Sequence, residues 1–225
     1  MSQQTQTAPE EMASFFDVRA DGYDNHMITE VYDGDHELFY AQIVSPLSDT
    51  DAPVRVLDLG CGTGLELAYI FNKAPHARIT CMDMSANMLE LLQQKYAQQA
   101  DQIECVQGSY VSEPFAQNEY DYAVSVMTIH HLLEDAKREL YVNIRNALKE
   151  GGLYIEGDYV ENEAEEQKLL KEYHNTMKDA DSDQLYHIDV PFTVQRQERL
   201  FAEAGFTEVN TIYHEGSRAI FVVKK

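Results

Sequence analysis

The chain has 225 residues, 44% of them hydrophobic, which is enough to bury a sizeable core within one α/β domain. Its 17 Lys and Arg residues stand against 39 Asp and Glu residues, and the formal net charge of -22 argues against a nucleic acid substrate. No run of about 18 apolar residues indicates a transmembrane helix. Residues 1–11 read as an unstructured start without the features of a secretory signal, so we expect a cytoplasmic protein that does not bind membranes.

The first 53 residues are expected to form a helical lid segment. Residues 11–24 are predicted to be one helix and residues 36–44 a second. Residues 45–53 are rich in Pro, Ser and Asp and are predicted to be a loop. The remaining residues, 54–225, are expected to form the main part of the same structural domain.

From residue 54 onward, strand-like and helix-like segments alternate, which predicts parallel strands with crossover helices on both faces. Apolar residues recur every three or four positions over residues 88–96 and 140–148, as expected for helices that face a core. A further charged helix is predicted between residues 160 and 180. Its glutamates near the start suit the positive end of the helix dipole, so we expect no catalytic role for them.

The cysteines and acidic runs do not predict a metal site. Cys61, Cys81 and Cys105 are odd in number and lack C-x-x-C spacing, which indicates reduced thiols. The acidic run at residues 179–183 is similar to the start of a calcium loop, but Gln184 and Val190 stand where such a loop has glycine and glutamate. A second acidic run at residues 33–37 is expected to be a solvated turn.

A glycine-rich segment follows the first buried strand. Gly60, Gly62 and Gly64 remove the Cβ atom where the chain turns and a ligand approaches the backbone, and Asp58 lies two residues before the first glycine. The dinucleotide fingerprint G-x-G-x-x-G would require glycine where this chain has Leu65. This difference weakens the alternative of a dinucleotide-dependent oxidoreductase.

This loop resembles the cofactor loop of the class I S-adenosylmethionine-dependent methyltransferases. Four later segments resemble the same family in the same order. They are the strand that ends at Asp83, the strand and histidine pair at residues 120–132, the Gly-Gly turn and strand at residues 147–155, and the late helix at residues 199–206. Together with the glycine loop, they cover roughly residues 54–223. The resemblance implies a Rossmann-like, doubly wound, mostly parallel seven-stranded α/β sheet with one antiparallel edge strand, plus N-terminal helices.

The resemblance implies S-adenosylmethionine as the cofactor and S-adenosylhomocysteine as the product. It assigns Asp58 and the glycines to the methionine moiety, and Asp83 with Met84 to ribose and adenine. Ser109 replaces the acid that commonly contacts the adenine amino group. Arg19 and Tyr23 are lid candidates, although both could only pack the leader helix. The expected cofactor-binding residues are Arg19, Tyr23, Asp58, Gly60, Cys61, Gly62, Gly64, Asp83, Met84, Ser109, Tyr110 and Met127.

Methyl transfer requires an aligned acceptor and a site shielded from water, and it needs a base only when the acceptor carries a proton. His130 and His131 follow the fourth strand at its carboxyl end, where open α/β sheets bind ligands. Asp158 follows the fifth strand. These three are the catalytic candidates, against the alternatives that the histidines line the cofactor pocket and that Asp158 caps the next helix.

We therefore expect methyl transfer to a small molecule, not to a nucleic acid. A protein that binds S-adenosylmethionine without turnover remains an alternative. The sequence leaves open the acceptor, its reacting atom and the oligomeric state, because acceptor specificity lies in the leader and in residues 160–192.

Overall fold

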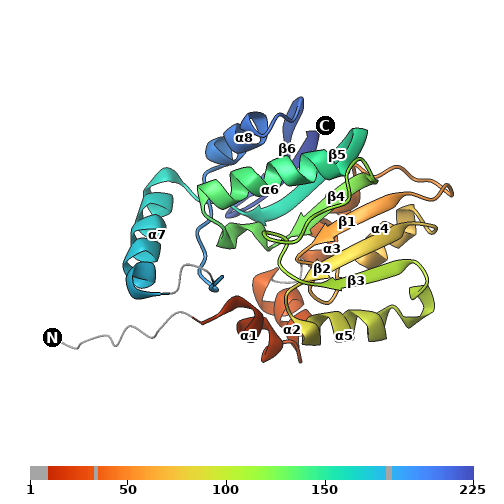
Figure 1. The fold of residues 1–225 in the computed structure, drawn as a ribbon, viewed down its shortest axis with the longest axis horizontal. Helices are drawn as coiled ribbons and strands as arrows, with labels where there is room; N and C mark the ends of the chain where they lie inside the picture. The colour runs from red at the N-terminus through yellow and green to blue at the C-terminus, as the bar shows by residue number, and fades with distance from the viewer. Residues whose placement is uncertain (1–9, 33–34, 181–183) are drawn as a thin grey trace.

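The computed structural model describes residues 10–32, 35–180 and 184–225 (Figure 1). The expected unstructured start therefore lies almost wholly outside the described residues, as do parts of both acidic runs. In the described ranges, no helix is both long and apolar enough to cross a bilayer.

A single seven-stranded sheet organises the chain, with the order β3-β2-β1-β4-β5-β7-β6. The strands are β1 Arg55–Leu59, β2 Arg78–Asp83, β3 Ile103–Gln107, β4 Tyr120–Val126, β5 Leu148–Tyr159, β6 Glu208–Glu215 and β7 Arg218–Lys224. Strands β1 to β5 pair in parallel, whereas β7 runs antiparallel to β5 and β6 and lies one place inside the edge. The predicted fold class is confirmed. The strand order reverses between β1 and β4, which is where such sheets bind ligands.

Helices cover both faces of the sheet (Figure 1). One core includes α6 (Glu134–Ala147) and α8 (Val194–Glu203), and the other includes α3 (His36–Val44), α4 (Leu67–Lys73) and α5 (Ala86–Lys95). Strand β1 is buried on both sides, because Leu57 belongs to the first core and Val56 to the second. The remaining downstream elements are α7 Glu163–Thr176 and the 3-10 turns η2 Ala97–Gln99, η3 Ile129–His131 and η4 Met177–Asp179.

The prediction of a single helix over residues 11–24 is wrong. The leader contains α1 (Met12–Asp17), α2 (Tyr23–His26) and a π-helical turn, η1 (Met27–Val31). Gly22 has a φ of +84°, and this left-handed conformation separates α1 from α2. Asp17 Oδ1 accepts hydrogen bonds from Ser85 Oγ at 2.6 Å and from the Asn87 amide at 3.2 Å. The leader is thereby fixed to the start of α5, beside the carboxyl edge of the sheet (Figure 1).

Candidate functional site

The glycine loop connects β1 to α4 at the carboxyl edge of the sheet. Gly60, Gly62 and Gly64 have φ values of +64°, +50° and +71°. A Cβ atom on Gly60 would collide with the side chain of Thr128, whereas one on Gly62 would first meet Tyr23 at 3.8 Å. The loop therefore needs glycine at both positions for backbone conformation, and additionally for space at Gly60.

Asp83 ends β2 and is bonded directly to this loop. Its Oδ2 atom accepts a hydrogen bond from the Gly62 amide at 2.9 Å, and Oδ1 accepts one from the Ser85 amide at 2.8 Å. Burial raises the pKa of Asp83, while these backbone hydrogen bonds oppose the shift. The structure thus brings together the strand-end acid and the glycine loop, 21 residues apart in the chain.

Two buried carboxyl groups lie beneath the loop. The side-chain oxygens of Asp58 and Oε1 of Glu66 are buried and have no hydrogen-bond partner among the described residues. Burial and the proximity of Glu66 raise the pKa of Asp58 well above its usual value, and burial also raises the pKa of Glu66. Sequence reasoning missed Glu66, although an acid two residues after the third glycine in an otherwise apolar helix start could have indicated it.

Of the remaining predicted cofactor residues, some line a cavity and others are buried in the core. Met84 and Ser109 line a cavity of about 470 Å³ together with Leu185. Tyr110 is buried, and its hydroxyl donates to the backbone oxygen of Thr128 at 3.1 Å. Cys61 is buried within the loop.

The leader lies against the glycine loop through α2. The Tyr23 ring is next to Gly62, and burial raises the pKa of its hydroxyl well above the usual value. The neighbouring Asp24 accepts a hydrogen bond from Thr63 Oγ1 and pairs with Lys95 at 2.5 Å. Arg19 instead is exposed, where its guanidinium stacks over Phe15 at 3.7 Å. Of the two lid candidates, only Tyr23 contacts the loop region.

A second cavity, of about 590 Å³, separates the leader from the carboxyl ends of β4 and β5. Its lining includes Phe16 and Tyr23 from the leader, Met127 after β4, and the histidines of η3. Met127 has a φ of +53°, a left-handed conformation that is uncommon for a residue with a Cβ atom. Such backbone strain is concentrated at functional sites.

Both predicted histidines line this cavity, and the predicted aspartate is buried beside His130. Asp158 Oδ1 lies 2.5 Å from His130 Nδ1, and its Oδ2 accepts a hydrogen bond from the His130 amide at 2.9 Å. Asp158 is not a helix cap, because the Asn162 side chain caps α7. Burial works to lower the pKa of His130, but Asp158 outweighs it and the pKa is raised. The structure thus places all three catalytic candidates in one contact network.

Two residues that sequence reasoning missed complete the floor. Asp189 Oδ1 lies 3.2 Å from His131 Nδ1 and 3.6 Å from His130 Nε2, and the His187 ring centroid is 4.8 Å from that of His131. Burial and nearby His130 lower the pKa of His131 to about 4. The amide of Val190 donates to the His130 backbone oxygen at 2.8 Å, which fixes this segment beside η3.

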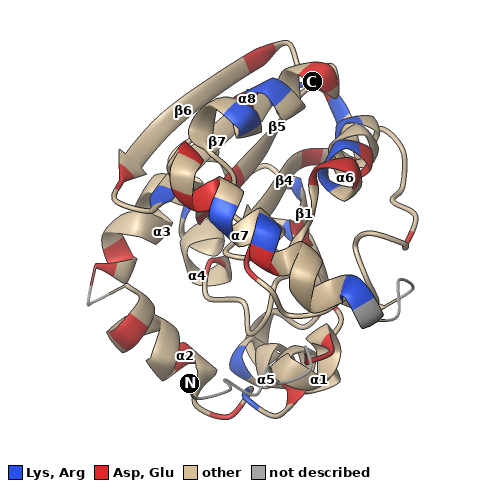
Figure 2. Ribbon diagram, turned by 90° about the vertical axis from the view of Figure 1, so that its left-hand side faces the viewer, with Lys and Arg blue, Asp and Glu red and all other residues tan. Residues whose placement is uncertain are grey.

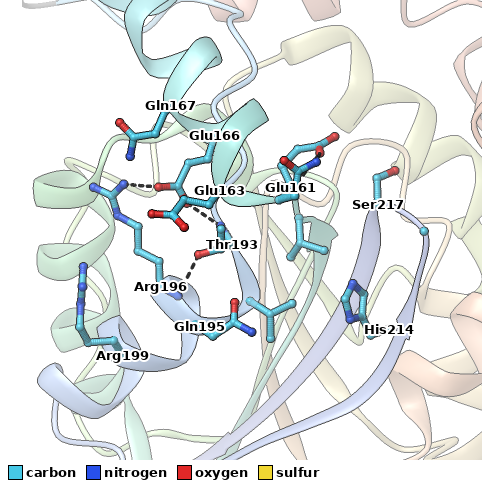
Figure 3. A pocket seen from close by; sticks show the side chains of 14 residues that line it. Glu161, Glu163, Glu166, Gln167, Thr193, Gln195, Arg196, Arg199, His214 and Ser217 are labelled. Carbon is cyan, nitrogen blue, oxygen red and sulfur yellow. Dashed lines mark hydrogen bonds and ion pairs between the residues drawn. The ribbon is translucent and has the colours of Figure 1, made fainter.

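A third cavity, of about 1180 Å³, lies elsewhere, between α7, the start of α8 and the β6–β7 turn. Arg196 Nη1 donates to Glu166 Oε1 at 2.6 Å, and the Thr193 amide donates to Glu166 Oε2 (Figure 3). None of the residues predicted for cofactor binding or catalysis lines it. None of its lining residues belongs to the glycine loop or to the end of β2, which makes it a poor candidate for the reaction site.

Comparisons with known proteins agree with this arrangement. The methyltransferase domain family matches residues 56–152, which contain the glycine loop, Asp83 and both histidines. The chain is 29% identical to the demethylmenaquinone methyltransferase of Lactococcus lactis over 206 residues, covering 80% of this chain and 76% of that protein. It is 27% identical to the malonyl-[acyl-carrier protein] O-methyltransferase of Priestia megaterium over 130 residues, covering 56% of this chain and 46% of that protein.

The fold is also found among solved structures. A DhpI-SAM-HEP complex superimposes with a TM-score of 0.69 at 16% identity, covering 94% of this chain and 95% of that one. At that identity the match shows the fold alone. The chain spans about half or less of the length of the first curated relatives that it matches.

Proposed function

Because the chain belongs to the class I S-adenosylmethionine-dependent methyltransferases, we propose that it transfers the methyl group of this cofactor to a small molecule bound in the 590 Å³ cavity. The main support for this proposal is the position of Tyr23 and Met127. Tyr23 lies against the glycine loop and also lines the cavity, and Met127 lines the cavity at the end of β4. The loop and the cavity are therefore adjacent, as transfer between two bound molecules requires.

The proposed position of the cofactor follows from buried polar side-chain atoms that have no hydrogen-bond partner among the described residues. The cationic methionine end of S-adenosylmethionine fits beside the glycine loop, where the buried Asp58 and Glu66 oxygens have no hydrogen-bond partner among the described residues. Asp83 then accepts from the ribose hydroxyls, since each carboxylate oxygen has more than one acceptor site. Met84 and Ser109 flank the adenine, with Ser109 in place of the acid that the family commonly has.

The proposed reaction is a displacement at the methyl carbon. A lone pair on the acceptor forms the new bond to carbon while the carbon–sulfur bond breaks, which leaves neutral S-adenosylhomocysteine. The cofactor supplies the leaving group, so the protein has to align the acceptor, exclude water and take up any proton that the acceptor loses. His130 and His131 line the acceptor cavity and supply the polar groups for that last task, while the buried Asp158 holds the His130 ring in place.

The leader, residues 1–53, is proposed as the lid of this site. Phe16 contacts Tyr23 and His131 at centroid distances of 6.2 Å, and so links the leader to the floor. A nucleic acid acceptor is disfavoured by the net charge of -22, and Figure 2 shows no surface on which Lys and Arg residues gather without Asp and Glu residues among the described helices near the leader and α7. Three free cysteines support a cytoplasmic location for the protein.

The test measures cofactor binding and turnover separately. Calorimetry should show S-adenosylmethionine binding to the purified chain. Mass spectrometry should then detect S-adenosylhomocysteine with a panel of small hydroxyl, amine, thiol and carbon-acid acceptors, but not with bulk tRNA. Binding without product across the panel would favour the non-catalytic alternative, and strong labelling of tRNA would overturn the small-molecule assignment.

A further inference from the structure

We infer that His130, His131 and Asp189 form a binding site for a divalent transition-metal ion at the floor of the acceptor cavity. Neither the sequence motifs nor the relatives point to such a site. The two histidines are buried within η3, whereas the Asp189 side chain is 49% exposed toward the cavity. The three residues therefore present two imidazoles and one carboxylate to a single opening.

The separations of the two histidine nitrogens from the carboxylate oxygen fit coordination of one ion. One ligand atom from each residue lies within 4.8 Å of the other two. Asp189 Oδ1 lies 3.2 Å from His131 Nδ1 and 3.6 Å from His130 Nε2. Two ligands bound tetrahedrally to an ion at about 2.0 to 2.1 Å are about 3.3 Å apart. The two nitrogens already flank the carboxylate oxygen at that spacing.

His131 carries the second, independent observation. Its Nδ1 atom is buried and has no hydrogen-bond partner among the described residues, even though Asp189 Oδ1 is only 3.2 Å away. The pair is thus close without hydrogen-bond geometry. A buried polar atom without a partner is costly, and a metal ion bound to both atoms would satisfy it.

Asp158 prepares His130 as a ligand. It occupies Nδ1 of the ring at 2.5 Å and the backbone amide at 2.9 Å, which leaves Nε2 as the ring atom directed at Asp189. A carboxylate behind a metal-bound histidine orients the ring in this way in many metal sites. Asp158 is therefore assigned as a positioning residue, and it does not touch the ion.

The donor set selects the class of ion. Two imidazoles and one carboxylate suit Zn²⁺, Fe²⁺ or Co²⁺, whereas Mg²⁺ and Ca²⁺ prefer oxygen ligands. Three protein ligands leave coordination positions open toward the cavity, where Phe16 and Met127 form nearby walls. An acceptor with an oxygen or sulfur donor can occupy such a position, and the ion then lowers its pKa. This acceptor class depends on the proposed function, but ion binding does not.

Metal binding can be measured without turnover. Chelator-dialysed protein titrated with Co²⁺ should show visible absorbance that saturates at one ion per chain, and Zn²⁺ should displace it. Asp189→Asn keeps the side-chain shape but removes the charge, and it should weaken Co²⁺ binding by at least about tenfold. His131→Ala should abolish the signal. His26→Ala is the matched control, because His26 also lines the cavity but lies outside the donor set.

Binding of S-adenosylhomocysteine, measured on each variant, reports whether the chain is folded and tests the cofactor site independently. Asp189 is partly exposed, so Asp189→Asn gives a folded variant even if His131→Ala does not. The proposal is overturned if the wild-type chain binds no stoichiometric Co²⁺, or if Asp189→Asn binds Co²⁺ as tightly as the His26→Ala control. Whether or not Co²⁺ binds, the binding of S-adenosylhomocysteine is a separate test of the cofactor site.

Discussion

The Gly62 amide donates a hydrogen bond to Asp83 Oδ2 at 2.9 Å, so the glycine loop and the end of β2 hold each other in place. A ligand that reaches both elements therefore meets a preorganised pair of polar groups. This coupling means that Asp83 acts on the proposed cofactor site in two ways, through its own oxygens and through the position of the loop.

Asp83→Ala should weaken S-adenosylmethionine binding by roughly 2 to 4 kcal/mol, because two charge-assisted hydrogen bonds to ribose are lost. Calorimetry on the folded variant measures the change. Glu104→Ala removes an exposed acid from the neighbouring strand β3 and should leave affinity unchanged. Equal affinities for the two variants would contradict the ribose assignment.

Substitutions of the loop glycines should affect the free energy of unfolding and the affinity for the cofactor differently. Gly60→Ala should lower the free energy of unfolding more than Gly62→Ala does, because only a Cβ atom at Gly60 collides with Thr128. The Cβ atom of Gly62→Ala makes only an ordinary contact with Tyr23 at 3.8 Å, so the substitution should cost only about 1 to 2 kcal/mol from its positive φ. Its S-adenosylhomocysteine affinity should nevertheless fall sharply. Urea unfolding and calorimetry on both variants test this ordering, and a Gly62→Ala protein with normal affinity would exclude the loop as the contact.

The local patterns of the chain were sufficient to predict the sheet, the glycine-rich turn after β1 and the position of Asp83 at the end of β2. Each depends on residues close in sequence: a buried strand followed by glycines, or a strand that ends in an acid. The break at Gly22 was missed because an isolated glycine inside a helical pattern does not by itself mark a left-handed turn.

Asp189, Asp17 and Asp24 were not predicted, because long-range folding alone brings them to the site. Asp17 reaches Ser85 across 68 residues, and Asp24 reaches Thr63 across 39. Asp189 is similarly distant in sequence from both histidines, in a segment without helical or strand periodicity. Only the folded backbone shows that these aspartates surround the proposed site.

Glu156 should make stability depend on pH. Burial raises the pKa of Glu156 to about 7, even though Tyr141 and Tyr154 donate to its carboxyl group. Between its unfolded pKa of 4.5 and about 7, the folded state binds more protons, so the stability that this group contributes falls as pH rises.

Glu156→Gln removes this proton linkage. The unfolding free energy of the variant relative to wild type should increase by about 2 to 3 kcal/mol between pH 5 and pH 8, as about 1.4 kcal/mol per pKa unit implies. Urea titrations at both pH values measure it. Glu150→Gln, at a side chain that is 89% exposed, should show no such trend, and a flat difference for Glu156→Gln would mean that this carboxyl is not proton-linked to folding.

Phe16→Ala tests the proposed acceptor cavity apart from the cofactor site. The ring packs near Tyr23, His131 and His187, so its loss opens the cavity to water. For an acceptor found by the screen, kcat/KM should fall about tenfold or more, while S-adenosylhomocysteine affinity stays within about twofold. Val142→Ala removes an exposed apolar side chain from α6 and is the control. An unchanged kcat/KM would place the acceptor elsewhere.

Deleting residues 1–24 should abolish turnover while the sheet remains folded. The deletion removes α1, Tyr23 and Asp24, and with them the hydrogen bonds to Ser85 and Thr63, but β1 begins only at Arg55. Circular dichroism should show a cooperative unfolding transition close to that of the full chain, and S-adenosylhomocysteine should bind more weakly because the loop loses its contact with α2. Deleting residues 1–9 keeps α1 and α2 and should preserve activity. Full methyl transfer by the longer truncation would show that the leader is not a lid and that the acceptor binds at an open surface.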